Sequence, residues 1–173
     1  VSCTDSTVKM EHVLASDNTQ KSVGSGAVFS VGSNVSIVAS AFRSSRNFGL
    51  GAGVLYALAG STVNVQLTQF KACAQMNEAG AASADASIRS ASVAVIDSSD
   101  MSVARSSFDG NVGGATILAI ASKLTVSRTV FRQNTAGASE AATTPSGRRL
   151  SESDFDNNEA TTISLQAGSV ALL

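Results

Sequence analysis

A short frame that ends in phenylalanine recurs five times along this chain. In each copy a serine or threonine lies two residues before the phenylalanine, and a branched aliphatic residue lies five residues before it. The residue seven positions before it is apolar in every copy except the last, where it is Arg148. The five copies end at Phe42, Phe70, Phe108, Phe131 and Phe155. This repetition predicts an architecture of stacked repeats, because one such unit cannot bury its apolar face alone.

The residues that lead to each phenylalanine alternate between apolar and polar, as in Leu124-Thr125-Val126-Ser127. Period-two alternation with β-branched residues indicates a strand with one buried face, and the three-to-four spacing of a helix is missing. A glycine-rich bend, an apolar run and a turn of small residues precede this strand, as in residues 113–123. We therefore predict an all-β fold, a parallel β-solenoid of about five to six coils.

The whole chain, residues 1–173, is interpreted as one segment of a longer solenoid. Residues 1–23 fit the frame weakly, with Ala15 in the place of the phenylalanine and Asn18 three residues after it. The spacings from Phe108 onward match one coil, and the longer ones leave extra residues that we assign to protruding loops at 71–86 and 135–147. The last residues repeat the start of a coil, which favours a fragment of a longer chain.

Stacked coils turn each position of the frame into a column. The phenylalanines would form an aromatic stack inside the core or at a corner. Three residues after them the column contains Asn111, Asn134 and Asn158, preceded by Asn18, Ser45 and Cys73. Asparagine favours turns and its stacked amides bind one another, so we interpret both columns as structural ladders.

The residue directly after each phenylalanine forms a charged column. From the second repeat onward it contains Lys71, Asp109, Arg132 and Asp156, with Ser16 and Arg43 before them. Because the signs alternate from Lys71 onward, a solvated charge ladder is the favoured interpretation, although exposed pairs contribute little each. A row that binds a ligand is the alternative.

Other charged residues suggest chemistry only weakly. Arg105 and Arg128 occupy equivalent positions followed by Glu152, and two such arginines could hold a carboxylated sugar. Pairs such as Asp97 with Asp100, or the set Asp154, Asp156 and Glu159, could bind Ca²⁺ or act as a general acid and base. Turns of secreted solenoids are often rich in Asp without either function. We therefore expect no catalytic residue, metal ligand or cofactor.

Composition narrows the partners. Charged residues make up only 14% of the chain and give a net charge of −1, which disfavours nucleic acid, an anionic membrane surface and polyanions in general. No apolar run reaches the length of a membrane span. The single histidine, His12, is expected on the surface of an edge coil, and no nucleophile or zinc-ligand spacing accompanies it.

The two cysteines and one sequon complete the candidate sites. Cys3 and Cys73 fall in different columns about two coils apart, beyond the reach of a disulfide. They are expected to be free thiols or to pair outside this segment. Asn34-Val35-Ser36 is a possible glycosylation site, placed by the frame in a turn.

Two motifs carry a family resemblance. GGATI at 113–117, with the variants GSGAV and GAGVL, and the Phe-x-x-Asn sequences FDGN, FRQN and FDNN resemble the repeats of polymorphic outer-membrane proteins, the autotransporter-like surface proteins of chlamydiae. Similar repeats occur in algal and protist surface proteins, including components of flagellar hairs. Phe42 and Phe70 depart from the motif, because Ser45 and Cys73 stand where it has Asn.

The resemblance implies a right-handed parallel β-helix of the pectin-lyase-like type on a secreted or surface-displayed protein. We accordingly expect an extracellular structural or adhesive segment whose partners are other subunits, copies of itself, or carbohydrate. The alternative is a polysaccharide lyase or glycoside hydrolase of the same fold, since fold alone transfers no activity. Ice binding would need a flat threonine array, which no column supplies.

Overall fold

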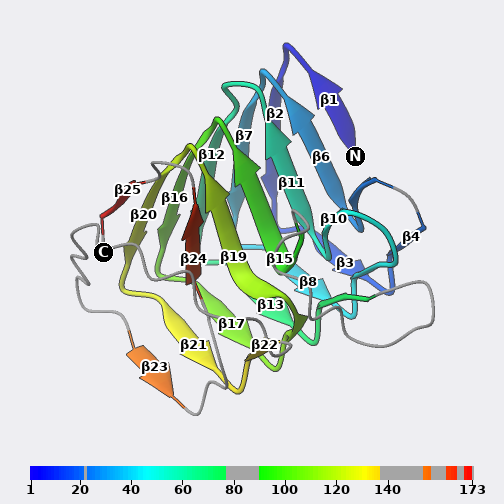
Figure 1. Ribbon diagram of the computed structural model, residues 1–173, viewed down its shortest axis with the longest axis vertical. Coiled ribbons are helices and arrows are strands. Elements are labelled where there is room, and N and C mark those ends of the chain that lie inside the picture. The colour runs from blue at the N-terminus through cyan, green and yellow to red at the C-terminus, as the bar shows by residue number, and fades with distance from the viewer. Residues whose placement is uncertain (22, 77–89, 137–153, 157–162, 167–169, 173) are drawn as a thin grey trace.

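The chain winds into a parallel β-solenoid of about four turns (Figure 1). The computed structural model describes residues 1–21, 23–76, 90–136, 154–156, 163–166 and 170–172. Within these ranges there is no helix, and every strand pair is parallel. The predicted fold class, an all-β parallel solenoid, is confirmed.

Each coil contributes short strands to four sheets, here called A to D in chain order. Sheet A contains β1 (Ser2–Thr4), β6 (Val28–Val31), β11 (Leu55–Leu58), β15 (Ser90–Asp97), β19 (Ala115–Ile120) and β24 (Ile163–Gln166), together with β5 (Gly24–Ser25) and β10 (Gly51–Ala52). Sheet B contains β2 (Thr7–Glu11), β7 (Asn34–Val38), β12 (Thr62–Gln66), β16 (Asp100–Ala104), β20 (Lys123–Ser127) and β25 (Val170–Leu172). Sheet C contains β3 (Leu14–Ser16), β8 (Ala41–Arg43), β13 (Gln69–Lys71), β17 (Ser107–Asp109), β21 (Val130–Arg132) and β23 (Asp154–Asp156). Sheet D contains β4 (Thr19–Gln20), β9 (Arg46–Asn47), β14 (Ala74–Gln75), β18 (Val112–Gly113) and β22 (Thr135–Ala136).

The strand register reproduces the frame read from the sequence. Phe42 pairs with Phe70, Phe70 with Phe108, Phe108 with Phe131, and Phe131 with Phe155. The weak first coil also follows it, since Ala15 pairs with Phe42. Residues 1–21 therefore stack on the next coil as a true repeat despite the missing aromatic ring.

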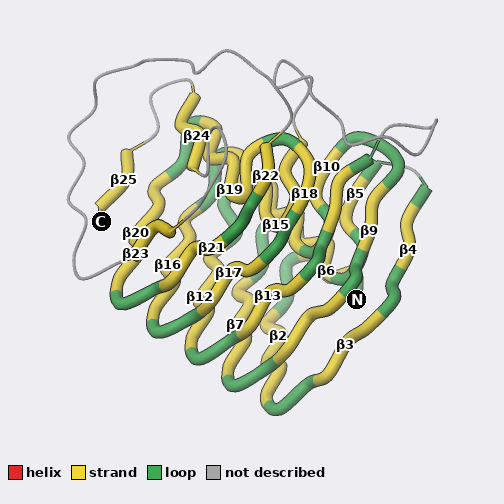
Figure 2. Tube along the Cα trace, turned by 90° about the horizontal axis from the view of Figure 1, so that it is seen from below, coloured by secondary structure: helices red, strands yellow, loops and turns green. Residues whose placement is uncertain are grey.

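Three corners of each coil, between sheets A and B, B and C, and C and D, share one backbone geometry. The residue at the tip has a positive φ, for example 51° at Arg105 and 48° at Arg128. Such left-handed residues cost about 1–2 kcal/mol each when they are not glycine. The tip N–H is nevertheless satisfied by the next coil, as Arg105 N donates to Ser127 O at 3.0 Å. Figure 2 shows the turns of the B–C corner lined up along one edge of the solenoid.

The interior is filled by columns of inward side chains. Sheet B supplies two apolar columns, one through Val63 and one through Val65, and sheet C supplies the phenylalanines. Equivalent side chains lie about 4.8 Å apart in the stacking direction. Valine, isoleucine and alanine suit such a narrow interior, which explains why the chain has many small apolar residues and few aromatics.

Sheet A differs from the other sheets because its outer face is apolar too. A second cluster, separate from the core, contains Tyr56, Val95, Leu118 and Ile120, all buried. A sheet that is buried on both faces needs continuous apolar runs rather than alternation. This accounts for the uninterrupted apolar runs at 54–58 and 117–120, whose second apolar face the sequence frame did not identify.

The end of the chain departs from the predicted order. The frame placed a sheet B strand directly before Phe155, with Arg148 and Leu150 at its inward positions. Instead β25 pairs with β20, so Ala171 continues the column of Leu124. An arginine in that column would bury an unpaired charge, which costs far more than burying alanine. Arg148, Leu150 and Ser153 themselves lie outside the described residues.

The two predicted loops begin later than expected. Lys71 ends β13, and Ala74–Gln75 form β14, so the segment 71–86 starts within the coil. Thr135–Ala136 likewise form β22 at the start of 135–147. Two-residue strands are too short to produce a periodic pattern, so the sequence could not separate them from a loop. Residues 77–89 and 137–153 lie outside the described residues.

Close backbone contact leaves no room for a side chain at Gly53. A Cβ on Gly53 would lie 2.1 Å from the Ser92 carbonyl oxygen and 2.8 Å from that of Ala74. We expect Gly53→Ala to lower the free energy of unfolding by about 3 kcal/mol or more, because rigid backbone atoms would have to move. Gly60→Ala is the matched control, since nothing lies within 4 Å of its Cβ and only its φ of 79° is unfavourable. Its expected loss is about 1 kcal/mol. Urea denaturation followed by circular dichroism measures both, and equal losses would contradict the contact.

Candidate functional site

The A–B corner contains a serine column that the sequence analysis missed. Each serine lies at the same offset before the phenylalanine position, and the members are Ser6, Ser33, Ser61, Ser99 and Ser122. Each hydroxyl donates to a carbonyl of its own turn, and from Ser33 onward each also accepts the backbone N–H of the preceding serine at 3.1–3.3 Å. Extending the alignment further before the frame would have found this column.

The serine or threonine of the frame forms the same device at the B–C corner. Ser40, Thr68, Ser106 and Thr129 are buried, and each hydroxyl donates to the carbonyl two residues before it at 2.8–2.9 Å. Ser106 Oγ also accepts the backbone N–H of Thr68 at 3.2 Å. These hydroxyls are therefore used by the backbone and are not available as nucleophiles.

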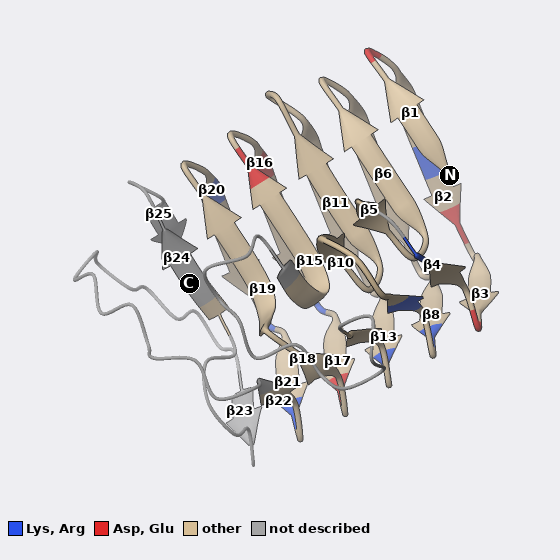
Figure 3. Ribbon diagram, turned by 45° about the vertical axis from the view of Figure 1, so that its right-hand side comes forward, with Lys and Arg blue, Asp and Glu red and all other residues tan. Residues whose placement is uncertain are grey.

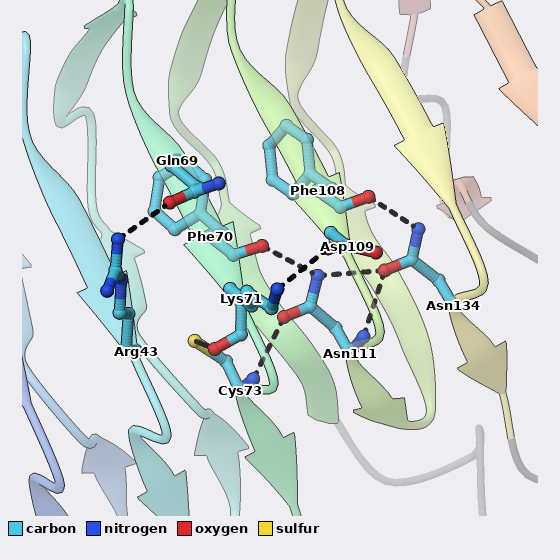
Figure 4. Close-up of polar contacts among 9 residues, drawn as sticks. All are labelled: Arg43, Gln69, Phe70, Lys71, Cys73, Phe108, Asp109, Asn111 and Asn134. Atoms are coloured by element: carbon cyan, nitrogen blue, oxygen red, sulfur yellow. Dashed lines mark hydrogen bonds and ion pairs between the residues drawn. The ribbon is translucent and has the colours of Figure 1, made fainter.

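At the C–D corner the predicted asparagine column forms an amide ladder (Figure 4). The Oδ1 atom of Asn111 accepts the N–H of Cys73 at 2.9 Å, and its Nδ2 donates to the Phe70 carbonyl at 3.2 Å. One coil further, Asn134 Oδ1 accepts Asn111 Nδ2 at 2.8 Å, and Asn134 Nδ2 donates to the Phe108 carbonyl at 3.0 Å. Each amide thus ties its coil to the preceding one. Asn158 lies outside the described residues.

The phenylalanine rings stack behind this ladder. Ring centroids lie 5.5 Å apart for Phe42 and Phe70, 4.8 Å for Phe70 and Phe108, and 4.6 Å for Phe108 and Phe131. The planes are within 17° of parallel, and all four side chains are at most 1% exposed. The rings fill the core and present no surface to a ligand. For Phe155 the structure describes only the backbone pairing.

The charged column lies on the outer face of sheet C. Lys71 Nζ is 3.5 Å from an Asp109 carboxylate oxygen, and both side chains are partly exposed. Arg43, the register neighbour of Lys71, donates from Nη2 to Gln69 Oε1 at 3.3 Å. Arg132 stands between Asp109 and Asp156 in backbone register. An exposed pair of this kind contributes at most about 1 kcal/mol.

Two shallow, adjoining depressions mark this face of sheet C. One has a volume of about 420 Å³ and the other of about 290 Å³, and Gln69 lines both of them. The larger is lined by Gln69, Ser107, Phe108, Asp109, Val130, Arg132 and Gln133. The smaller is lined by Arg43, Ser44, Gln69, Lys71 and Ala72. Together they follow the charged column across successive coils.

The other candidate residues are not brought together. Arg105 and Arg128 are exposed tips of the B–C corner, whereas Asp97 and Asp100 flank the A–B corner, with Asp97 buried and Asp100 exposed. His12 is exposed at a corner tip of the first coil, as predicted. Glu152 and Glu159, with the side chains of Asp154 and Asp156, lie outside the described residues. Among the residues that are described, no three His, Cys, Asp or Glu side chains are placed to hold a metal ion.

The sequon was misplaced by the sequence analysis. Asn34 begins β7 instead of lying within a turn, and Ser36 is inside the same strand. Alternation along a strand still leaves the Asn34 side chain exposed. A turn was expected because Gly32 and Ser33 precede it, but the corner ends one residue earlier than the small-residue run suggested.

Both cysteines are free and buried, so no disulfide joins them. Cys73 takes the place of asparagine in the C–D corner, where its Sγ approaches the carbonyls of Lys71 and Phe42 at 3.5 and 3.6 Å. Burial raises the pKa of the Cys73 thiol to about 11, against weaker opposing effects of hydrogen bonds with the backbone of Ser45 and Lys71. A neutral thiol of this kind is a poor nucleophile.

Comparisons with known proteins do not identify a family. No family model, curated protein or solved structure matches this chain. The described residues also contain no helix of the length and apolarity that a membrane crossing requires.

The amide ladder predicts a large effect at Asn111. We expect Asn111→Ala to lower the free energy of unfolding by about 3 kcal/mol, because it removes the partner of the buried Cys73 N–H and one partner of the Phe70 carbonyl. Asn64→Ala is the control, since this half-buried asparagine lies on the outer face of sheet B, where its Oδ1 accepts a long hydrogen bond from Gln66 Nε2 at 3.4 Å. Its expected change is within about 0.5 kcal/mol. Similar losses of unfolding free energy in the two variants, measured by urea denaturation, would show that the amide ladder contributes no more stability than an asparagine on an outer face.

The raised pKa of Cys73 predicts a loss of stability in alkali. The folded state holds the thiol proton more tightly than the unfolded state. This stabilisation is therefore complete below the ordinary thiol pKa of 9.0 and falls as the pH rises toward the folded-state pKa of about 11. The expected loss is about 2 kcal/mol. Cys73→Ser is the control, because serine occupies the same column at Ser45 and does not titrate in this range. Urea denaturation of both proteins across this pH range measures the difference between their free energies of unfolding. This difference should narrow as the pH rises. A constant difference would contradict the titration.

Proposed function

We propose that this chain is a structural or adhesive segment of an extracellular or cell-surface protein. The observation that carries the proposal is the use of the buried polar side chains. Serine, threonine and asparagine at three corners of the coils bind the backbone of their own or a neighbouring coil. Such columns hold coils in register, and they leave none of these groups for chemistry on a substrate.

The proposal includes a right-handed winding, the hand that about 98% of parallel crossovers adopt. It also includes about five to six coils, the number that the repeat frame predicts. The extracellular location is supported by the resemblance of GGATI and FRQN to repeats of polymorphic outer-membrane proteins and of algal or protist surface proteins, with a pectin-lyase-like fold. A glycan on Asn34 would project from the outer face of sheet B.

A polysaccharide lyase or glycoside hydrolase is the alternative function. Glycosidases use a pair of carboxyl groups that flank the scissile bond. In the described part of the chain Asp97 and Asp100 lie at the A–B corner, while Asp109 lies on sheet C. These carboxyl groups do not face a common cleft, which favours the structural function.

Other copies of the chain are the proposed partners. Strands β1, β2, β3 and β4 form one end of the stack, and each is paired along one edge only with described strands. Open edges of parallel strands present backbone donors and acceptors to any further strand in register. Stacking of a further coil on these edges, from another copy or from the same longer chain, would therefore extend the solenoid by the strand pairing that already joins its own coils.

Sedimentation velocity over a concentration series tests this function. We expect oligomers that grow with concentration and elongated particles in electron micrographs. Val8→Lys should reduce assembly, because Val8 packs at the end of the core, where a charge would oppose burial. Val38→Lys is the matched control, since Val38 is half-buried on the outer face of sheet B, one coil in from that end, and takes no part in the exposed end of the core. A compact monomer at all concentrations that degrades polygalacturonate would overturn the proposal in favour of the enzyme.

A further inference from the structure

We propose that the outer face of sheet C, with the adjoining B–C corner, binds an acidic polysaccharide. This inference rests on the proposed adhesive function and names the partner of that surface. The surface is called the basic face here, and its cations are Arg43, Lys71, Arg105, Arg128 and Arg132.

The net charge of the whole chain gives no indication of the basic face. Each of four successive coils places at least one of these cations on it, and all five side chains are exposed. In Figure 3 blue positions lie along sheet C on β8, β13 and β21, with red positions at β3 and β17 in the same row and further red positions near β1 and β16. A balanced composition therefore becomes an asymmetric surface once the chain is wound. The proposal therefore departs from the expectation from composition that polyanions are disfavoured.

Acidic groups on the same face are fewer. Asp109 forms an ion pair with Lys71 at 3.5 Å, and Asp156 stands next to Arg132 in backbone register. In the first coil the positions equivalent to these cations are occupied by Ser16 and His12, and the acidic residues Glu11 and Asp17 lie directly beside them. The excess of positive charge thus covers the coils from Arg43 to Arg132.

The spacing of the basic face suits a linear polymer. Successive coils advance by about 4.8 Å, so Arg43 and Arg132, three coil steps apart in one column, are separated by about 14 Å along the stack. The advance per coil is similar to the length that one sugar residue adds to an extended polysaccharide. A chain that lies along the stack can therefore repeat the same contacts from coil to coil.

The polar groups between the cations favour a sugar over a nucleic acid. Gln69, Ser107 and Gln133 line the two depressions and can exchange hydrogen bonds with hydroxyl groups. Arginine binds carboxylates in a bidentate geometry, which suits uronate residues. Single-stranded nucleic acid needs exposed aromatic rings for stacking, but the phenylalanines of sheet C from Phe42 to Phe131 point into the core.

Binding to immobilised polygalacturonate tests the inference, with neutral dextran, dextran sulfate and duplex DNA as comparison probes. We expect polygalacturonate to bind, dextran not to bind, and affinity to fall as salt is raised. The double variant Arg105→Gln, Arg128→Gln should weaken binding about tenfold, as the loss of two charge contacts implies. Asp109→Asn should strengthen it, because an anion is removed from the same face.

The matched control is the double variant Lys9→Gln, Lys123→Gln, which removes two cations from sheet B. It should leave affinity for polygalacturonate unchanged. Equal losses of affinity in the two double variants would overturn the inference, and so would equal binding of DNA and polygalacturonate. Preferential binding of dextran sulfate would identify sulfate instead of carboxylate as the recognised group. Sedimentation without polymer separates this test from that of the proposed function. If the chain still assembles but binds no polysaccharide, only the inference that the basic face binds polysaccharide is rejected.

Discussion

Hydrogen bonding between successive coils is the interaction on which the rest of this structure depends. Parallel strands satisfy their backbone groups only through their neighbours, so a solenoid must keep every coil in register. Corners endanger this arrangement because the chain turns and would leave N–H groups buried without partners. In this protein a left-handed tip donates to the following coil, and the inward polar residue after it binds the backbone of the corner. Register is thereby kept through the turns as well as along the strands.

The same register sets what the interior can contain. Equivalent side chains lie above one another, so each column must accept its own neighbours at the spacing of strands. Phenylalanine meets this condition by near-parallel stacking, and valine meets it by its compact branched shape. Asparagine stacks on itself at the C–D corner because its side-chain amide both donates and accepts hydrogen bonds. Cys73 interrupts that column with a thiol, which has no amide to continue the ladder and approaches two carbonyls instead.

An interior so fully used by stacking leaves recognition to the outside of the coils. Outward positions are free to vary from coil to coil, since they take no part in the core. On sheet C they combine cations with amide and hydroxyl groups across two open depressions. Sheet A differs from sheet C, because the outer face of sheet A is itself buried and apolar. The outer faces of these two sheets are therefore available for different roles, although the coils that build them are the same.

The sequence by itself determined the repeat, the strands of sheets B and C, and the columns of phenylalanine and asparagine. It could do so because period-two alternation and a fixed offset from an aromatic residue are local features of the chain. Tertiary structure alone decided the second apolar face of sheet A, the two-residue strands of sheet D and the placement of β25 above β20. These depend on which segments meet, and residues far apart in sequence carry no local signal of that meeting. The basic face belongs to the same class, since charges such as Arg43 and Arg132 become neighbours of one surface only when the coils are stacked.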